Sequence, residues 1–294
     1  MTTTTHSVRC SDGFMLEATI HAAAQPARAV VQINPATAVT ERMYFPFAGY
    51  LTAQGFDVVT YNYRGMRVGG PHPKSVKAGF MTWADQDVEA MTRWVAERYA
   101  DVPRLAVGHS FGGHAIGLCD SSRLLSAAVM ICAHAGCLRF IRPFGERLRG
   151  ALLLKVIGPL CAHALGFVPA RRLGFGENLP GQVMLEWSRW TSLPRYFFDD
   201  PRTHALERFR QQRLPVLSLG MEDDPWAPPE AIDLLARELA GCAVERRQLG
   251  PSDSRGQAVG HLGFFRRHHA DTLWPVITQW LERHIASELH GARP

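Results

Sequence analysis

The stretch Arg104-Leu-Ala-Val-Gly-His-Ser-Phe-Gly-Gly-His114 decides the fold, because it joins a short apolar run to a glycine-rich turn and then to a helix. The apolar run is typical of a parallel strand buried on both faces, and His114 to Leu118 continue as a helix of small residues. Ser110 lies at the turn between them, within a Gly-x-Ser-x-Gly pattern. We interpret the stretch as a nucleophile elbow, in which a strained backbone presents the serine hydroxyl above the sheet.

The glycines of this turn have a steric purpose. Side chains at Gly108 and Gly112 would collide with the strand and the helix, and Gly113 adds room for close packing. The amide of Phe111 begins the helix and points toward the place where negative charge develops on a substrate carbonyl oxygen. The alternative is an incidental serine in a glycine-rich turn, but the flanking strand and helix favour a nucleophile, Ser110, beside half of an oxyanion hole.

Length and composition exclude several other classes of protein. The 294 residues, 46% of them hydrophobic, are enough for one large or two small globular domains. No run approaches eighteen apolar residues, and the first six residues do not resemble a signal peptide. Six cysteines without a Cys-x-x-Cys pair favour reduced thiols in the cytoplasm over a zinc site or a disulfide scaffold. The net charge of +5 is modest and the arginines are dispersed, which argues against nucleic-acid binding.

Strand and helix alternate through the first half of the chain. His6 to Cys10 and Phe14 to His21 read as a hairpin around Ser11-Asp12-Gly13. Buried strands are expected next, at 29–34, 56–61, 103–107 and 127–132, with helices at 41–54 and 82–99 and after Ser110. This alternation predicts an α/β fold with a mostly parallel central sheet and helices on both faces.

The alternation stops after Cys132 and resumes at Leu214. Between them no short apolar strand is evident, but helical patterns are, at 139–154, 156–165 and 184–195. Two strands (214–219 and 243–249) and two helices (229–239 and 264–289) are then expected. A stretch of about eighty residues is too long for a plain connection. We therefore predict a core domain of residues 1–134 and 214–294, with a helical cap inserted at 135–213.

The predicted cap is rich in large apolar and aromatic side chains. Most of them are expected to form the cap's own core, and others to line a pocket above Ser110. The residues concerned are Phe140, Phe144, Phe167, Phe175, Trp187, Trp190, Tyr196 and Phe197.

A serine hydroxyl is a poor nucleophile near neutral pH, so the site requires a base and a group that orients the base. Asp223 and Asp224 follow the strand that begins near Pro215, which puts them at the carboxyl end of the sheet, in the same layer as the elbow. His261 follows the last strand and is flanked by Gly260 and Gly263. We predict His261 as the base, with one of the two aspartates orienting it.

The order Ser110, Asp224, His261 is the triad order of the α/β-hydrolase fold, and the chain resembles the capped branch that contains serine aminopeptidases and monoacylglycerol lipases. The resemblance covers nearly the whole chain. Its motifs are Gly-His-Ser-Phe-Gly-Gly at 108–113, Tyr-Arg-Gly at 63–65, the acidic loop ending in Pro228, and Gly-His-Leu-Gly-Phe-Phe at 260–265. The resemblance implies that Ser110 attacks a carbonyl carbon, that His261 moves the proton, and that an aspartate holds the imidazole.

Two details of the site stay open at this level. Similar enzymes usually carry a proline four residues after the catalytic acid, which favours Asp224, whereas counting from Gly220 favours Asp223. They also carry His-Gly after the third strand, where this chain has Asn34-Pro35. The resemblance implies that the amides of Ala36 and Phe111 form the oxyanion hole, although proline fixes the backbone just before the Ala36 amide.

We therefore expect a cytoplasmic serine hydrolase that cleaves carboxylic esters with an apolar acyl or alcohol part. No cofactor, metal, nucleic-acid partner or stable membrane insertion is expected. The alternatives are a thioesterase, an amidase or aminopeptidase, or an acyltransferase using the same site. From another class, a non-catalytic binding module on the same fold is also considered. In the cap, Arg171-Arg172 either solvate a helix end or attract an anionic head group.

Overall fold

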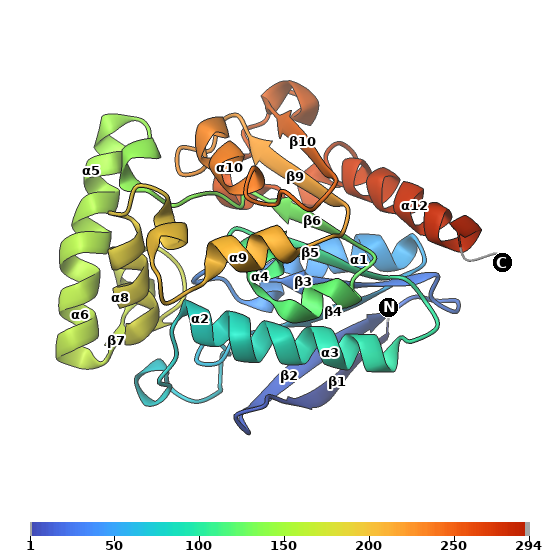
Figure 1. Cartoon of the computed structure of the whole chain (residues 1–294), viewed down its shortest axis with the longest axis horizontal. Helices are drawn as coiled ribbons and strands as arrows, with labels where there is room; N and C mark the ends of the chain where they lie inside the picture. Colours follow the sequence, from blue (N-terminus) through green and yellow to red (C-terminus); the bar gives the residue numbers. More distant parts are fainter. Residues whose placement is uncertain (1, 292–294) are drawn as a thin grey trace.

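The protein is built on one eight-stranded sheet, seen in a computed structural model that describes residues 2–291 (Figure 1). Its strand order is β1-β2-β4-β3-β5-β6-β9-β10. The first two strands are antiparallel to each other, β2 is antiparallel to β4, and the remaining pairs are parallel. The strands are β1 (Thr2–Arg9), β2 (Met15–Ala22), β3 (Ala29–Asn34), β4 (Phe56–Tyr61), β5 (Arg104–His109), β6 (Ala127–Ile131), β9 (Val216–Met221) and β10 (Val244–Leu249).

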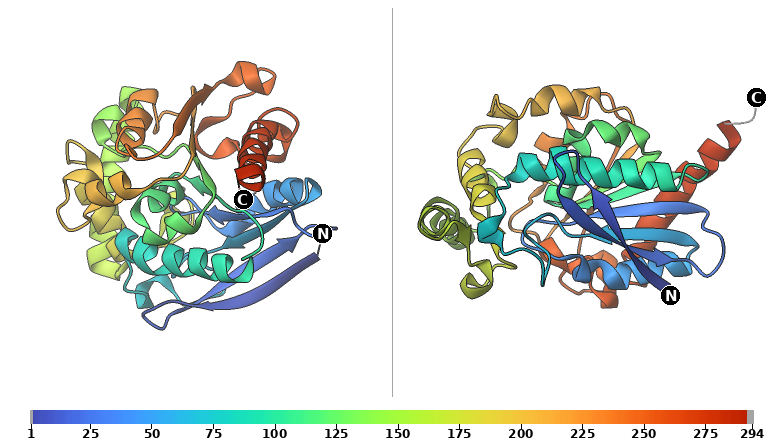
Figure 2. Two further views of the ribbon diagram at one scale, coloured as in Figure 1. Left: turned by 45° about the vertical axis from the view of Figure 1, so that its right-hand side comes forward. Right: turned by 90° about the horizontal axis from the view of Figure 1, so that it is seen from below.

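Helices cover both faces of the sheet (Figure 2). One face packs against α1 (Phe45–Ala53) and α12 (Trp274–Gly291), and the other against α3 (Glu89–Arg98), α4 (Phe111–Leu118) and α9 (Ala205–Gln211). Successive side chains of a strand point to opposite faces. Accordingly Leu105 and Val107 of β5 are buried on the face that packs against α1 and α12, and Ala106 on the face that packs against α3, α4 and α9. The prediction of an α/β-hydrolase architecture is confirmed in its sheet and in its layers.

Three helices of the core differ from the prediction. The helix expected at 82–99 begins earlier, as α2 (Phe80–Thr82), and continues through a π-helical segment (Trp83–Val88) into α3. The last helix begins at Trp274 rather than near Phe264. Residues 264–273 instead form short turns, because Phe264 and Phe265 are buried in the core and the Trp274 indole donates to the Phe264 carbonyl oxygen at 2.7 Å. α10 (Pro229–Ala236) is shorter than expected.

The segment between β6 and β9 is mainly helical, and its residues 144–190 lie at the left of Figure 1. The helices predicted at 139–154 and 156–165 are one continuous helix, because a π-helical segment (Leu153–Ile157) joins α5 (Phe144–Leu152) to α6 (Gly158–Leu165). After it come α7 (Ala170–Leu173) and α8 (Gly181–Trp190). Two short strands, β7 (Phe167–Val168) and β8 (Leu179–Pro180), were not expected. α9, within the same range, packs on α4 of the core, so the division into two domains stays a prediction.

Aromatic side chains connect this segment to the elbow. Trp190 of α8 stacks on Phe80 with ring centroids 5.5 Å apart, and Phe80 packs on Phe111 at 4.6 Å. Trp190 and Phe197 are fully buried. Phe144 is 67% exposed, so it is not one of the residues that form a core in this segment.

Candidate active site

Ser110 lies between the end of β5 and the start of α4, with φ +52° and ψ −112°. This strained conformation is the one expected of a nucleophile elbow. A Cβ atom at Gly112 would come within 2.0 Å of the Asn34 carbonyl oxygen, and one at Gly108 within 2.4 Å of the Gly112 carbonyl oxygen. The Ser110 amide also donates to the Ile131 carbonyl oxygen of β6 at 2.8 Å. Backbone packing on both sides therefore fixes the turn.

Three side chains from distant parts of the chain form one hydrogen-bonded chain at the carboxyl end of the sheet. His261 lies in the short helix α11 (Gly260–Gly263), and its Nε2 atom is 3.1 Å from the Ser110 hydroxyl oxygen. Its Nδ1 atom is 2.6 Å from Asp224 Oδ2, in the loop after β9. The structure thus brings Ser110, His261 and Asp224 together in the geometry that a base-activated serine requires.

The two ionisable members of this chain shift each other's pKa in opposite directions. Burial lowers the pKa of His261, but the charge of Asp224 and the hydrogen bond to it raise that pKa by more than burial lowers it. The pKa of His261 is therefore raised from its usual value of 6.5. Burial raises the pKa of Asp224, but the charge and hydrogen bond of His261 outweigh it and hold the pKa well below its usual range. Asp224 is therefore an anion at neutral pH, and it stabilises the imidazolium that forms when His261 takes a proton.

Asp223 has a different set of contacts from its neighbour. Its carboxylate accepts the amide N–H groups of Val259, at 2.7 Å, and Gly260, at 2.8 Å. Asp224 turns the other way, because its Oδ1 atom accepts the amides of Trp226 and Ala227 while Oδ2 meets His261. Of the two aspartates left open by the sequence, Asp224 contacts the imidazole and Asp223 holds the backbone just before it.

The two amides expected in an oxyanion hole have different surroundings. The Phe111 N–H has no hydrogen-bond acceptor among the described residues, which suits a donor reserved for a ligand at the N-terminus of α4. The Ala36 N–H donates to the hydroxyl oxygen of Tyr44 at 2.8 Å. The Ala36 amide is therefore already bound to a side chain of the protein, and its role in the hole stays a prediction.

Tyr44 and His109 form a buried link that the sequence did not reveal. The His109 Nε2 atom is 2.8 Å from the carbonyl oxygen of His261, so Nε2 carries the hydrogen, and Nδ1 accepts the Tyr44 hydroxyl hydrogen at 2.9 Å. Burial lowers the pKa of His109 to about 3, which keeps the ring neutral and this assignment intact. The link joins the Ala36 loop, the end of β5 and the backbone of His261. A histidine beside the nucleophile was its only signal in the sequence.

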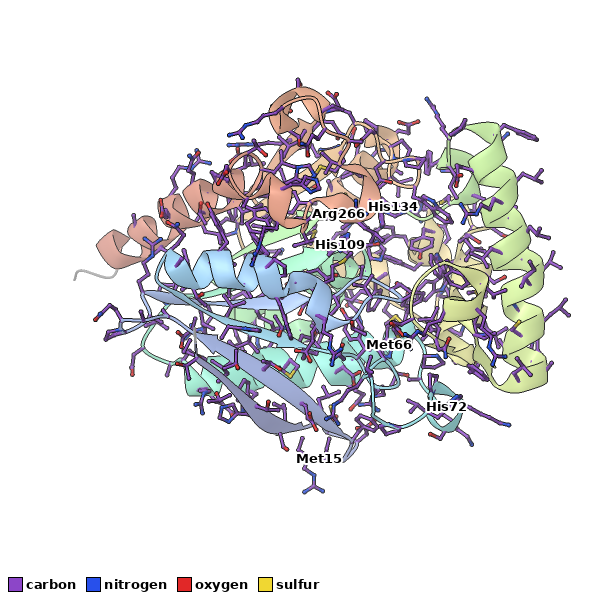
Figure 3. All side chains as sticks on the ribbon, turned by 180° about the vertical axis from the view of Figure 1, so that it is seen from behind. Met15, Met66, His72, His109, His134 and Arg266 are labelled. Atoms are coloured by element: carbon purple, nitrogen blue, oxygen red, sulfur yellow. The ribbon has the colours of Figure 1, made fainter. Side chains whose placement is uncertain are left out.

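His134 is a second unexpected neighbour of the base. Its ring meets that of His261 edge-on, with centroids 5.4 Å apart, and its Nδ1 atom lies 2.9 Å from the Cys132 carbonyl oxygen. Burial lowers the pKa of His134 to about 4, so it faces the site as a neutral ring. In Figure 3, His109 and His134 both lie on the side of the core toward the cap helices.

Ligand atoms of Cys132, Asp224 and His261 lie within 4.8 Å of one another, a spacing that a metal ion could use. A metal on His261 Nδ1 would displace the hydrogen bond to Asp224, and burial raises the pKa of the Cys132 thiol well above its usual value. A protonated thiol is a poor metal ligand. These residues therefore fit a proton relay better than a metal site.

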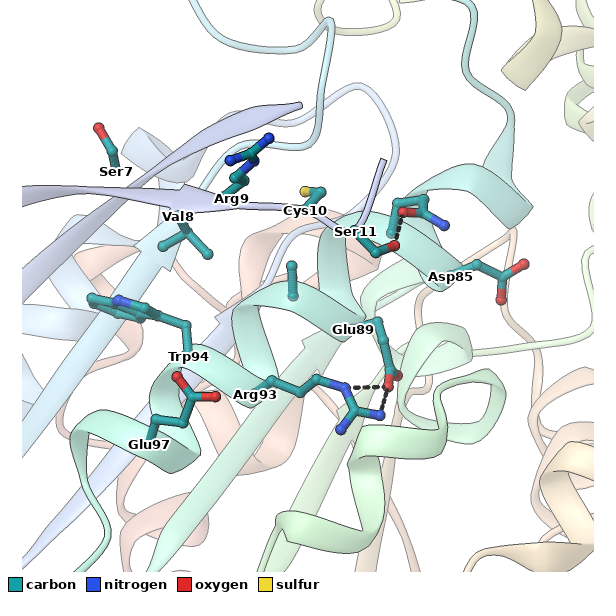
Figure 4. A pocket seen from close by; sticks show the side chains of 12 residues that line it. Ser7, Val8, Arg9, Cys10, Ser11, Asp85, Glu89, Arg93, Trp94 and Glu97 are labelled. Carbon is teal, nitrogen blue, oxygen red and sulfur yellow. Dashed lines mark hydrogen bonds and ion pairs between the residues drawn. The ribbon is translucent and has the colours of Figure 1, made fainter. Parts of the chain in front are cut away.

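A surface hollow of about 460 Å³ lies far from Ser110, between β1 and α3 (Figure 4). Two pairs of its polar side chains bind each other: Arg93 pairs with Glu89, and the Ser11 hydroxyl donates to Gln86. Arg64, from the Tyr-Arg-Gly motif, is likewise buried and paired with Asp87. Neither place includes Ser110, His261 or Asp224, so the hydrogen-bonded chain at Ser110 remains the candidate site.

Comparison with known families decides the class of protein. Residues 35–272 match the sequence model of the Alpha/beta hydrolase family. The chain belongs to this family. The expectation of an enzyme of the α/β-hydrolase type is thereby confirmed, whereas its assignment to the branch of serine aminopeptidases and monoacylglycerol lipases stays a prediction. No curated protein matches the α/β-hydrolase described here.

Solved structures similar to this α/β-hydrolase agree in fold along the whole chain. DcsB in complex with its substrate analogue has a TM-score of 0.65 at 17% identity, covering 97% of this chain and 100% of DcsB. A thermostable carboxyl esterase from Bacillus coagulans has a TM-score of 0.65 at 17% identity, with coverage of 97% and 99%. The esterase domain of a Rhodothermus marinus protein has a TM-score of 0.59 at 19% identity, with coverage of 97% and 100%.

Proposed function

We propose that this α/β-hydrolase cleaves carboxylic esters through an acyl-enzyme on Ser110. One observation carries the proposal: the Ser110 hydroxyl lies 3.1 Å from His261 Nε2, and His261 Nδ1 lies 2.6 Å from Asp224. That arrangement supplies a nucleophile, a base and an anion that orients the base. The presence of esterases among proteins of the same fold supports an ester as the bond that is cleaved.

The contacts define each step of the reaction. Ser110 Oγ attacks the ester carbonyl carbon while its proton moves to His261 Nε2, and Asp224 stabilises the resulting imidazolium. The Phe111 amide donates to the oxyanion, a contact typically worth about 3 kcal/mol in the transition state. The alcohol then leaves with the proton from His261. Water attacks the acyl-enzyme by the same route, which releases the acid and restores Ser110.

Phe111 is the fixed donor of the proposed hole. Ala36 can serve as the second donor only after its amide leaves Tyr44, because one N–H cannot make both hydrogen bonds at full strength. The proposed catalytic set is therefore Ser110, His261 and Asp224 with the Phe111 amide, and Asp223 is a positioning residue.

The test compares the wild type with Ser110→Ala on nitrophenyl esters, thioesters and aminoacyl anilides. We expect the wild type to prefer the esters and Ser110→Ala to lose the activity. A fluorophosphonate probe should label the wild type but not Ser110→Ala. Faster cleavage of anilides would reassign the enzyme as an amidase, and a folded wild type that the probe does not label would support a non-catalytic binding module.

A further inference from the structure

The continuous helix Phe144–Leu165, here called the outer cap helix, exposes large apolar side chains along its whole length. It forms the outer edge of the molecule, farthest from α12 in Figure 1, with α8 between it and the core. Six of its large apolar side chains are at least 43% exposed. They are Phe144, Leu148, Leu152, Val156, Leu160 and Leu165. Five of them recur at every fourth position, so they form one stripe rather than scattered exposures.

The inner face of the same helix carries mostly small residues. Gly150, Leu154, Gly158 and Ala162 are buried, also at every fourth position. A Cβ atom at Gly158 would come within 2.5 Å of the Met184 sulfur on α8, so this face is packed as closely as its backbone allows. A helix of a water-soluble domain normally buries its large apolar side chains and exposes its polar ones. The outer cap helix instead exposes its large apolar side chains and buries mostly small ones, which leaves its apolar face without a partner among the residues that the structure describes.

Length and composition make this helix compatible with lipid. Its 22 residues include a window with a mean hydropathy of 1.4, of which 22% is buried, so it is long and apolar enough to cross a membrane by these criteria. Two observations argue against crossing. Its inner face packs on α8, and Arg147 and Arg149 lie within its first turns. Both observations are compatible with a helix that lies in the plane of the lipid interface, with its inner face still packed on α8.

The charged residues around the apolar stripe indicate which kind of surface the helix would contact. From Arg139 to Arg172 the chain has seven basic residues and one acidic residue, Glu146, whereas its overall net charge is only +5. The rest of the chain is therefore nearly neutral, and the expectation of dispersed positive charge is wrong for the cap. Arg147 lies over the Phe144 ring at 5.2 Å, and the Arg149 side chain is 67% exposed. Arg171 and Arg172 lie exposed beyond the other end.

We propose that the outer cap helix docks this hydrolase on an anionic lipid surface. The apolar stripe enters the boundary between head groups and acyl chains, and the flanking arginines contact anionic head groups. A second copy of the chain is a less suitable occupant. A symmetric dimer through the stripe would bring two sets of arginines together, and like charges in contact oppose association. This proposal is independent of the bond that the enzyme cleaves.

The experiment is flotation of the purified full chain with vesicles. We expect the wild type to float with vesicles of phosphatidylcholine and phosphatidylglycerol, to bind phosphatidylcholine alone much more weakly, and to dissociate as salt is raised. Leu148→Gln, Leu152→Gln and Leu160→Gln combined should weaken binding on the order of a hundredfold. Each of Arg147→Gln and Arg149→Gln should weaken binding to the anionic vesicles about fivefold.

The matched control is Met15→Gln, which removes another half-exposed apolar side chain, on the β1–β2 hairpin (Figure 3). It should bind as the wild type does. Circular dichroism and the thermal unfolding midpoint check that every variant is folded, as expected for exposed positions. The proposal is overturned by a wild type that does not float with anionic vesicles, or by a triple leucine variant that binds as well as the wild type. A wild-type dimer that the triple variant converts to monomer, without vesicle binding, would assign the stripe to a second copy.

Discussion

The hydroxyl of Tyr44 accepts the amide N–H of Ala36 at 2.8 Å, and through His109 the same tyrosine is connected to the backbone of His261. One buried phenol thereby joins the loop after β3 to the loop that carries the proposed base. The positions of these two loops thus depend on each other. The ring of Tyr44 is fully buried, so water does not replace these bonds.

Tyr44→Phe should lower the free energy of unfolding by about 1–3 kcal/mol, because the Ala36 amide and His109 Nδ1 lose a buried partner. Urea denaturation measures the change. Tyr50→Phe, in the helix α1 that begins directly after Tyr44, is the matched control, since the Tyr50 hydroxyl is only partly buried and lies 3.4 Å from Thr278. We expect the control to cost less than about 1 kcal/mol. Equal losses in both variants would contradict a structural role of the Tyr44 link.

The pH dependence of catalysis should follow the protonation of His261. A base must be neutral to accept the serine proton, so activity falls as pH drops through its pKa. The charge and hydrogen bond of Asp224, outweighing burial, raise that pKa, so half-maximal kcat/KM is expected above pH 6.5. A pH profile of kcat/KM on a non-ionising ester measures it. A midpoint below 6.5 would disagree with the anionic contact described for His261.

Asp224→Asn and Asp223→Asn should differ strongly in effect. Replacing the acid that orients the base in a serine triad lowers kcat about 10⁴-fold, and we expect the same for Asp224→Asn. Asp223 acts only through the amides of Val259 and Gly260. Weakening one hydrogen bond to a charged group costs about 1.5–3 kcal/mol, so Asp223→Asn should lose about 10- to 100-fold. Steady-state kinetics of both variants measures the two losses of kcat. A larger loss in Asp223→Asn than in Asp224→Asn would reverse the roles assigned to the two aspartates.

Gly112→Ala should disrupt the elbow. The new Cβ would lie within 2.0 Å of the Asn34 carbonyl oxygen, a backbone atom that cannot rotate away. We expect the free energy of unfolding to fall by about 3 kcal/mol or more, with loss of activity. Gly145→Ala is the control in α5, where nothing lies within 4 Å of the added atom. In thermal unfolding, Gly145→Ala should be as stable as the wild type or more stable by up to about 1 kcal/mol. If Gly112→Ala were equally stable, a side chain would be tolerated at Gly112 and the steric argument would be wrong.

Local patterns in the sequence predicted the central sheet well. Buried strands such as Ala29–Asn34 and Phe56–Tyr61 are short apolar runs, and each occurs where it was expected. The start of the last helix was wrong by about ten residues. The stretch Phe264 to Leu273 contains no proline or glycine to end a helix. Pro275, the second residue of the observed helix, is a local signal against one helix running through from Phe264, whereas the tertiary contacts of Phe264 and Trp274 are in no local pattern.

For the candidate site, the sequence identified the residue types but not all of their contacts. The order of the motifs identified Ser110 and His261 as candidates. Asp223 and Asp224 are adjacent in the sequence, however, and only the shape of the turn after β9 determines which carboxylate contacts the His261 ring. Tyr44 could be recognised as buried from helical spacing. Its bond to His109, 65 residues away, depends on how α1 packs against the elbow.

The long segment between β6 and β9 has a consequence for the order of folding. Ala128 pairs with Val216, so this step closes a chain loop of about ninety residues, with a length-dependent entropic cost of about 4 kcal/mol. Ser110 precedes the loop, and Asp224 and His261 follow it. We therefore expect an early folding species to hold the serine turn while the strands bearing its acid and base are still unpaired. Helices that form early within the loop would shorten the effective length of chain between β6 and β9, and this would make the pairing of these strands faster.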